Sequence, residues 1–256
     1  MRATLTTPPP RTSPAPPPAS GPRLRVMHVA LSLDPGGAER LVVDLAVHSR
    51  PEFDPVVCCL DERGAWAAEL DEVAIPVHVL GRAPGFQPVL GRRLAQLAER
   101  VGADVLHCHQ YTPFVYGCLA KLFRPDLHLV FTEHGRLADA TISSKRRLAN
   151  RLLGRVPGKF FAVCDELRRF MVAEGFPARR LDVLYNGIDA GTPATVADRA
   201  QARERLGLGP NDYGIGSVAR LDRVKELGTL IAALVRLREA FSDGAAANGA
   251  SEEPRP

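Results

Sequence analysis

The sequence has few of the features that mark secreted, membrane-spanning or nucleic-acid-binding proteins. It has five cysteines in 256 residues, an odd number with no C-x-x-C pair, which argues against a disulfide framework and predicts reduced thiols. No segment approaches the roughly 20 apolar residues of a membrane-spanning helix, and the N-terminus lacks an apolar stretch of the signal-peptide type. The net charge of +4 is small beside 33 basic and 29 acidic residues, so we expect no nucleic-acid partner. These absences predict a soluble, cytoplasmic protein.

Between two tails of biased composition, short apolar runs alternate with longer segments of helical periodicity. Residues 1–22 contain eight prolines and cannot form a core, so we expect a disordered tail there and a second one over 242–256. The alternation predicts an α/β fold, a Rossmann-like doubly wound parallel sheet over 23–189. The expected strands are Leu24–Leu31, Val56–Leu60, Val77–Leu80, Val105–His109, Leu129–Thr132, Phe160–Val163 and Val183–Tyr185, and the expected helices are Ala38–Ser49, Ala65–Val73, Val89–Val101, Phe114–Phe123, Ser144–Leu153 and Glu166–Glu174.

A fragment of a second Rossmann-like domain is predicted late in the chain. Small and turn-forming residues place a linker over 190–212, which includes a helix at Ala197–Leu206. Residues Tyr213–Ala219 are expected to form a strand and Lys225–Arg238 the following helix, so that 213–241 begins the second domain. Because the sequence continues for only 31 residues after Lys225, we expect this domain to be incomplete.

Two adjacent glycines, Gly36 and Gly37, lie between the first expected strand and the first expected helix. Without a Cβ atom, both let backbone N–H groups approach an anion at the helix N-terminus. We interpret them as a candidate phosphate or sugar site, and a plain tight turn is the alternative. The motif is not G-x-G-x-x-G, so a nicotinamide-dependent enzyme is not favoured.

Histidines stand at the ends of two successive strands. His107 and His109 share one side of their strand, and His109 is at its C-terminal end, where ligands of such sheets bind. Glu133 and His134 end the next strand, and capping of the following loop is their alternative role. A zinc site is not favoured because Cys108 points to the other side and no second ligand pair has metal-site spacing. We therefore expect no metal.

Two cations, Arg220 and Lys225, flank the start of the last expected helix. A bidentate guanidinium and a point-charge ammonium together suit a pyrophosphate. Fixed cations also stabilise the negative charge that develops when a nucleoside diphosphate departs. Ordinary exposed charge is the alternative.

The helix expected over Ser144–Leu153 is basic and has Leu148 and Leu152 on one side. Such a helix suits contact with anionic lipid at the inner face of a membrane, and a solvated face above a core stripe is the alternative. The cations concerned are Lys145, Arg146, Arg147 and Arg151.

Taken in order, these motifs resemble retaining glycosyltransferases of the GT-B fold, and glycosyltransferase family 4 most of all. The motifs are G-G-A-E at 36–39, D-V-L-H-C-H at 104–109, T-E-H at 132–134, A-V-C at 162–164, N-G-I-D at 186–189 and the segment 216–225. The stretch T-E-H-G-R followed by S-K-R-R-L-A-N-R-L-L also resembles members tied to bacterial exopolysaccharide assembly. The resemblance implies an N-terminal acceptor-side domain, a C-terminal domain for the nucleotide sugar, and metal-independent transfer between them with retention of configuration.

The resemblance also implies a role for each candidate residue. The implied catalytic residues are His109, Arg220 and Lys225. Gly36 and Gly37, together with Arg220 and Lys225, would bind the phosphate or sugar of the donor. Glu133 and His134 would have an acceptor-side or structural role.

Two departures from the family pattern concern Cys164 and the end of the chain. Cys164 replaces the usual serine of the A-V-S segment, which we expect to change one local hydrogen bond. The E-x7-E pair, whose carboxylates meet the donor sugar and the ribose in this family, has no counterpart after Lys225.

Two functions are compatible with these motifs. The first is an enzyme that transfers a sugar from a nucleotide-sugar donor to a glycan or lipid-linked acceptor in polysaccharide or glycoconjugate biosynthesis. The alternative is a catalytically incomplete acceptor-binding fragment or pseudoenzyme that needs a partner chain. Its expected signature is an exposed apolar face on Tyr213–Arg238, because a lone strand and helix cannot bury both sides.

Overall fold

The computed structural model describes residues 23–135, 143–188, 191–219, 221 and 225–249. They belong to two units, one reaching Gly187 and the other beginning at Ile188. The expected N-terminal tail, the end of the expected C-terminal tail (250–256) and Arg220 lie outside the described residues.

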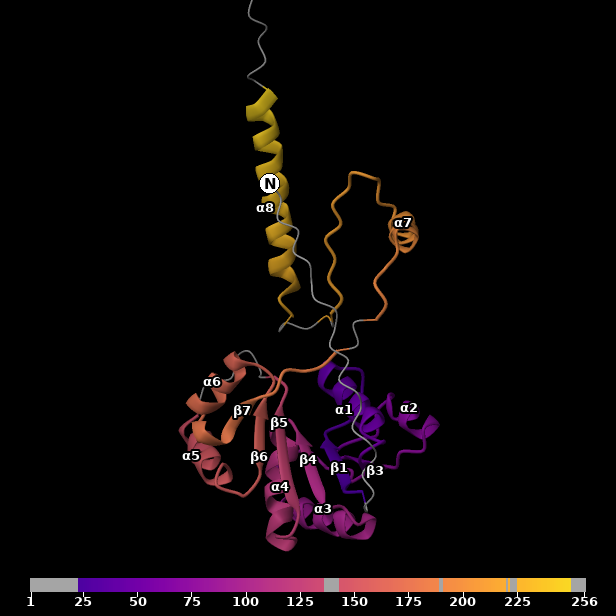
Figure 1. Ribbon diagram of the computed structural model, residues 1–256. Helices are drawn as coiled ribbons and strands as arrows, with labels where there is room; N and C mark the ends of the chain where they lie inside the picture. The colour runs from indigo at the N-terminus through magenta and orange to yellow at the C-terminus, as the bar shows by residue number, and fades with distance from the viewer. Residues whose placement is uncertain (1–22, 136–142, 189–190, 220, 222–224, 250–256) are drawn as a thin grey trace, which may run out of the picture. The chain divides into compact units, whose positions relative to one another are not determined.

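The first unit is built on a seven-stranded parallel sheet in the order β3-β2-β1-β4-β5-β6-β7 (Figure 1). The chain winds from β1 to β3, crosses back to β4 and then winds the other way, so the expected doubly wound fold is confirmed. The expected strand ends are right to within two residues. The strands are β1 Arg25–Ala30, β2 Asp54–Cys59, β3 Val77–Val79, β4 Val105–His109, β5 His128–Glu133, β6 Lys159–Ala162 and β7 Leu181–Val183.

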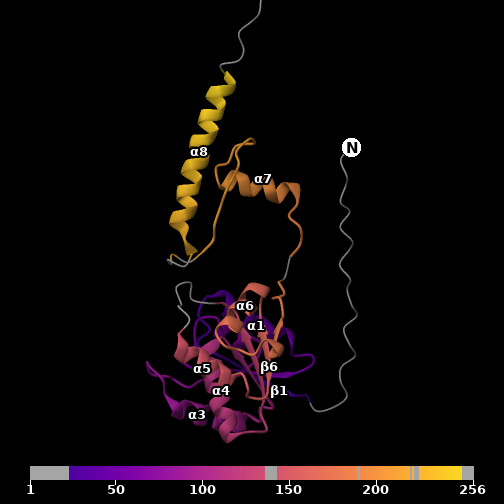
Figure 2. The ribbon, with the colours of Figure 1, turned by 90° about the vertical axis from the view of Figure 1, so that its left-hand side faces the viewer.

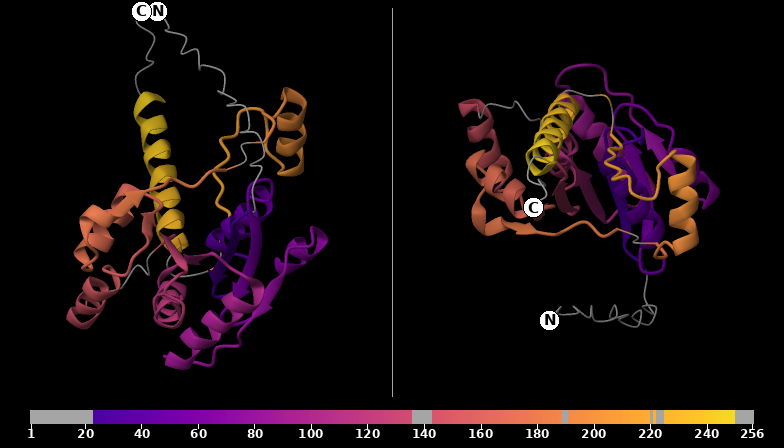
Figure 3. Two further views of the ribbon diagram at one scale, coloured as in Figure 1. Left: turned by 60° about the horizontal axis from the view of Figure 1, so that its bottom comes forward. Right: turned by 90° about the horizontal axis from the view of Figure 1, so that it is seen from above.

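Six α-helices connect these strands (Figures 1 and 3). Helix α4 begins three residues earlier than expected, since Pro113 is tolerated in a first helical turn. The helices are α1 Gly37–His48, α2 Ala67–Glu72, α3 Pro88–Val101, α4 Tyr111–Phe123, α5 Ser144–Leu153 and α6 Asp165–Ala173, with a 3₁₀ turn, η1, at Ala178–Arg180.

The two faces of the sheet carry separate hydrophobic cores. On one face Met27 and Val29 pack in a cluster with residues of α3, α4 and α6. On the other face Ala30 packs with residues of α1 and α2, including Val43. Side chains alternate along a strand, so His28 projects on the α1 side of the sheet. By the same alternation, the two histidines of β4 share that side.

Close packing on the first face depends on glycine. A Cβ added to Gly117 of α4 would lie 2.5 Å from Sγ of Cys108 on β4, and one added to Gly91 of α3 would lie 2.4 Å from Cβ of Leu119 on α4. A larger residue at either position would force the helix away from its neighbour. These glycines therefore set how closely α3 and α4 pack.

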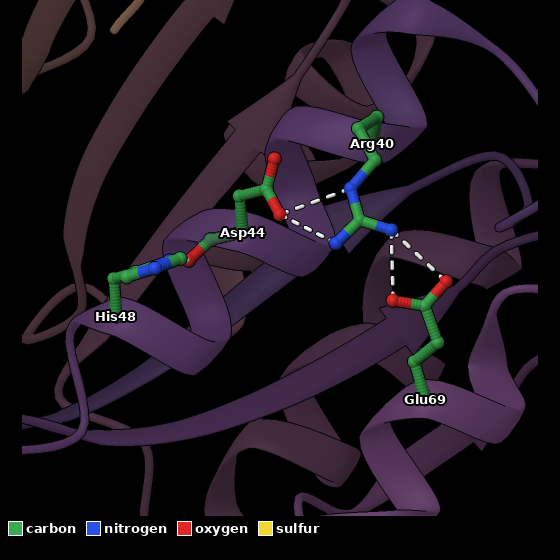
Figure 4. Close-up of polar contacts among 4 residues, drawn as sticks. All are labelled: Arg40, Asp44, His48 and Glu69. Carbon is green, nitrogen blue, oxygen red and sulfur yellow. Dashed lines mark hydrogen bonds and ion pairs between the residues drawn. The ribbon is translucent and has the colours of Figure 1, made fainter. Parts of the chain in front are cut away.

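Arg40 ties the first turn of α1 to α2 (Figure 4). Its guanidinium donates to both carboxylate oxygens of Glu69, at 2.9 and 2.7 Å, and to Oδ1 of Asp44, and it lies over the ring of Trp66. Nδ1 of His48 lies 2.8 Å from the carbonyl oxygen of Asp44 one turn later. The charged groups are about 40% exposed, so their contribution to stability is at most about 1 kcal/mol. Their effect is to fix the position of the start of α1.

The second unit contains two helices among its described residues, α7 Val196–Arg205 and α8 Leu227–Gly249 (Figure 2). A capping box begins α7: Oγ1 of Thr195 accepts from the N–H of Asp198, and the Asp198 carboxylate accepts from the N–H of Thr195.

Two expectations for this unit are wrong. Tyr213–Ala219 has an extended sequence pattern but forms no strand, because a strand needs a neighbour and none pairs with it among the described residues. The irregular tail expected from Ser242 is helical as far as Gly249, since α8 continues through an alanine-rich segment of high helix propensity.

Candidate functional site

The candidate site lies where the direction of winding of the sheet reverses, between the C-terminal ends of β1 and β4. In open α/β sheets this crevice is the usual place for a ligand. A small depression, called the pocket below, occurs there and has no room for a water molecule as it stands. It is lined by Ala30, Leu31, Ala38, Glu39, Val42, His109 and Gln110. The structure thus brings the start of α1 and the end of β4, which are separate motifs in the sequence, to one place.

Gly36 and Gly37 begin α1 directly before Ala38 and Glu39, which line the pocket. Gly36 is the extended N-cap residue, with φ −167° and ψ 156°, and no side chain caps the helix by a hydrogen bond. A Cβ at Gly37 would meet nothing within 4 Å, whereas one at Gly36 would lie 2.2 Å from Oε2 of Glu39. The Glu39 carboxylate therefore folds back over Gly36. An anion at these amides would require Glu39 to turn away, a requirement that the glycine motif alone does not indicate.

Four imidazoles gather beside the pocket, one from β1, two from β4 and one from the residue after β5. Nδ1 of His28 lies 3.1 Å from Nε2 of His109, and Nδ1 of His109 lies 3.0 Å from Nε2 of His134. His107 stacks on His109 with ring centroids 4.1 Å apart, and its Nε2 lies 2.9 Å from Oγ1 of Thr132. The predicted residues His109 and His134 are thus brought together, and His28 joins them.

Burial keeps these rings neutral. It lowers the pKa of His28 and His134 from 6.5 to about 4, and it lowers the pKa of His107 and His109 well below the ordinary value. His109 is only 2% exposed, and both of its ring nitrogens are engaged by other histidines. As long as these contacts persist, His109 presents carbon and ring edge to the pocket, with no free nitrogen.

Three of these four histidines form the one group among the described residues with the composition of a metal site. The candidate ligand nitrogens of His28, His107 and His109 lie within 4.8 Å of one another. Bonds of 2.0–2.1 Å to a tetrahedral zinc ion would hold such nitrogens roughly 3.4 Å apart. Among these three rings one contact, between Nδ1 of His28 and Nε2 of His109 at 3.1 Å, is at hydrogen-bond distance, and Nε2 of His107 lies 2.9 Å from Oγ1 of Thr132. These contacts describe hydrogen-bonded imidazoles, and no metal is proposed here.

Glu133, at the end of β5, is 7% exposed. Burial raises the pKa of this carboxyl group to about 7, although the N–H groups of Gly135 and His134 and the charge of Arg146 act in the opposite direction. Near neutral pH this group therefore changes its charge in the vicinity of the site.

Gln110 has a strained backbone conformation, with φ 73° and ψ 167°, at the N-cap of α4. This region of φ/ψ space is favourable for glycine alone, and such residues cluster at functional sites. Gln110 also lines the pocket, directly after His109. No pattern in the sequence identified it, because strain depends on the positions of β4 and α4.

The cations of α5 do not all face the same way. Nε of Arg146 lies 3.0 Å from Oε1 of Glu174 without the alignment of a hydrogen bond, and its guanidinium covers the ring of Tyr111 at 4.1 Å. Arg146 is thus held against the core of the unit. The exposed residues of the helix are Ser144, Lys145, Arg147, Leu148, Arg151 and Leu152.

Lys225 belongs to the second unit, where it is exposed. Binding of a diphosphate by Lys225 and Arg220 stays a prediction.

Comparisons with known proteins agree with this architecture. Residues 35–191 match the sequence profile of the family described as Glycosyltransferase Family 4. The structure of Anabaena Alr3699/HepE in complex with UDP and glucose is similar with a TM-score of 0.68 and 26% sequence identity, over 84% of this chain and 58% of that one. A glycosyltransferase from Rickettsia africae shares the fold at 15% identity, with a TM-score of 0.61 over 74% of this chain and 51% of that one.

No curated protein matches the sequence. The chain spans a little over half the length of the HepE chain. None of the helices in the described ranges combines the length and the apolar character needed to cross a bilayer.

Proposed function

Since the chain belongs to glycosyltransferase family 4, we propose that it acts in the transfer of a sugar from a nucleotide-sugar donor to a glycan or lipid-linked acceptor, with retention of configuration. The observation that carries this proposal is the pocket at the reversal point of the sheet, where Ala38 and Glu39, directly after Gly36 and Gly37, line the same depression as His109. The likeness of this chain to HepE, a protein crystallised with UDP and glucose, supports a uridine nucleotide as the carrier of the donor sugar. The proposed setting is polysaccharide or glycoconjugate biosynthesis in the cytoplasm.

In this proposal each part of the site has a distinct role. The uncapped N–H groups at Gly36 and Gly37 receive the phosphate or sugar of the donor once Glu39 has turned away. His109 contacts the transferring sugar through the carbon edge of its ring, since its nitrogens are engaged by His28 and His134. Arg220 with Lys225 neutralises the charge that develops on the departing diphosphate. These two cations supply positive charge, so the proposed reaction uses no metal.

Calorimetric titration of the chain with UDP, UDP-glucose and GDP tests the proposal, with Gly37→Asp and Gly37→Ala as a matched pair. Both substitutions have room, because a Cβ at Gly37 meets nothing within 4 Å. A carboxylate in the first turn of a helix stabilises it by about 0.3–1 kcal/mol, so Gly37→Asp should remain folded. The same charge about 5.5 Å from a phosphate would oppose binding by about 3 kcal/mol, or roughly a hundredfold.

We expect Gly37→Ala to bind UDP and the Asp variant to lose binding with an unchanged or higher melting temperature. Equal affinity of the two variants would show that the diphosphate does not lie at the start of α1.

One observation favours the alternative, an acceptor-binding fragment that needs a partner chain. From Ile188 onward, no side chain whose burial the structure describes is buried. Large exposed apolar residues there include Tyr213, Val218, Ile231 and Phe241. Such a surface normally has a covering partner. Binding and turnover of a UDP-sugar by this chain alone would rule the alternative out.

We also propose peripheral contact of α5 with an anionic membrane. Leu148 and Leu152 are 60% and 56% exposed, and they lie among Lys145, Arg147 and Arg151 on a helix without acidic residues. Arg146 is not part of this surface because it is held by Glu174 and Tyr111.

Co-sedimentation with phosphatidylglycerol vesicles tests the membrane contact. The double variant Lys145→Glu/Arg151→Glu should lose binding. Arg92→Glu, on the exposed side of α3, should keep it. Equal sedimentation of the two variants, or no sedimentation of the unaltered chain, would refute the contact.

A further inference from the structure

We propose that His28, His109 and His134 form one hydrogen-bonded chain of imidazoles, in which His28 and His134 position His109 and couple its tautomer to their own. The three rings come from neighbouring strands: His28 from β1, His109 from β4 and His134 from the residue after β5. The two contacts, 3.1 and 3.0 Å, are both within hydrogen-bond distance. The ring planes are nearly parallel, at 26° and 17°.

The number of ring protons couples the three imidazoles to one another. A neutral imidazole has one N–H donor and one acceptor nitrogen. The central ring, His109, uses both nitrogens, so it must donate to one neighbour and accept from the other. The contacts join Nδ1 to Nε2 in the same sense twice. Only two arrangements keep both hydrogen bonds: all three rings carry the proton on Nδ1, or all three carry it on Nε2.

The ends of the chain are open. Nε2 of His28 and Nδ1 of His134 are buried, and neither has a hydrogen-bond partner among the described residues. In one arrangement the spare donor is at His134, and in the other it is at His28. A group that binds one end therefore selects the tautomer of all three rings, including the ring of His109 that lines the pocket.

The role of His28 and His134 as positioning residues rests on the proposed function, because it assumes that His109 meets the sugar. The existence of the chain does not depend on it. His107 is the internal comparison: it packs against His109 at 4.1 Å between ring centroids, but its Nε2 bonds to Thr132 and takes no part in the chain.

Nitrogen-detected tautomer assignment tests the chain directly. The protein has seven histidines, so long-range ¹H–¹⁵N correlation spectra of the ¹⁵N-histidine-labelled chain resolve protonated and unprotonated ring nitrogens. At pH 7.5 we expect His28, His109 and His134 to be neutral and to share the same tautomer, or the same average of the two arrangements. Different tautomers or different averages among the three rings would refute the proposal, and so would one tightly bound Zn²⁺ per protein molecule that removes their N–H signals.

Substitutions separate positioning from packing. In His28→Leu, the signals of His109 and His134 should shift together, because His109 loses one hydrogen bond while its bond to His134 remains. His28→Asn, which restores a polar group at the place of Nδ1, should reduce this shift. His107→Leu changes packing beside His109 but should leave these signals unchanged. Equal shifts in His107→Leu and His28→Leu would reduce His28 to a packing role. Backbone amide spectra show whether each variant is folded. If a variant does not fold, the tautomers in the spectrum of the unaltered protein decide whether the imidazole chain exists.

UDP-glucose titration of the same variants then tests the link to function. Weakening by at least about tenfold in His28→Leu with recovery in His28→Asn supports positioning of His109. Unchanged affinity in His28→Leu, despite shifted His109 and His134 signals, would support the imidazole chain and overturn its role at the site. No affinity in the unaltered protein would refute the proposed function alone.

Discussion

Lowering the pH from 6.5 to 5.5 should destabilise the first unit through its buried histidines. In the unfolded chain the four rings titrate near 6.5, whereas in the folded chain burial lowers the pKa of His28 and His134 to about 4 and holds that of His107 and His109 well below the ordinary value. The unfolded state therefore binds more protons. The stability that these groups contribute is present above pH 6.5 and is lost as the pH falls.

Glu133 acts in the opposite sense. Burial raises its pKa to about 7 in the folded chain, with Arg146 and the backbone amides lowering it and Glu174 raising it. The contribution of a group with a raised pKa is fully present below its unfolded pKa of about 4.5 and is lost as the pH rises through about 7. Acidification to pH 5.5 therefore recovers some stability at this residue.

The magnitudes decide the net sign. Between pH 6.5 and 5.5 an unfolded histidine goes from half to about nine-tenths protonated, which amounts to about 1 kcal/mol for each ring that stays neutral when folded. The four rings together lose about 4 kcal/mol, and Glu133 recovers about 1 kcal/mol. The expected net loss is about 3 kcal/mol, a large part of the 5–15 kcal/mol typical of a folded domain.

Urea unfolding followed by the fluorescence of Trp66 measures this loss. Trp66 is the only tryptophan and packs against the core on the α1 side of the sheet. Glu133→Gln should increase the loss to about 4 kcal/mol, and His28→Leu should reduce it to about 2 kcal/mol. Equal free energies of unfolding at pH 6.5 and 5.5 would refute the reasoning, because they would mean that the buried rings take up protons without unfolding.

Three further predictions concern backbone strain, close packing and thiol exposure. In urea unfolding at pH 7, Gln110→Gly should raise the free energy of unfolding by about 1 kcal/mol, because glycine adopts the φ of 73° of this position without strain. A decrease in the free energy of unfolding would show that contacts of the Gln110 side chain outweigh the strain. Gly117→Ala should lower the free energy of unfolding by about 1–3 kcal/mol in the same assay, because its Cβ would collide with Cys108. Gly37→Ala should change it little, because a Cβ there meets no neighbour. Equal effects of the two substitutions would contradict close packing at Gly117. With Ellman's reagent one thiol, that of the partly buried Cys164, should react in the folded protein, and the other four should react only after unfolding. A second fast thiol would show that the core opens.

Much of the first unit was predictable from the sequence because the signals are local. A buried parallel strand reads as a short apolar run and a covering helix as a 3.6-residue period, so the seven strands of the sheet were placed to within two residues. The Gly36-Gly37 pair and His109 were found for the same reason: each stands at the end of a strand, where open sheets bind ligands. Local pattern failed at Tyr213–Ala219, since a strand exists only when another pairs with it.

The tertiary structure decided which of these residues meet. His28 lies in an apolar run and gave no signal of its own; it reaches His109 because β1 and β4 become neighbours at the reversal of the sheet. Tertiary structure also decides the surroundings of Arg146: the sequence predicts it on a basic surface, but it forms an ion pair with Glu174. Sequence patterns report how a residue sits on its own element, whereas hydrogen bonds, burial and the pKa values that follow from them depend on which elements are packed together.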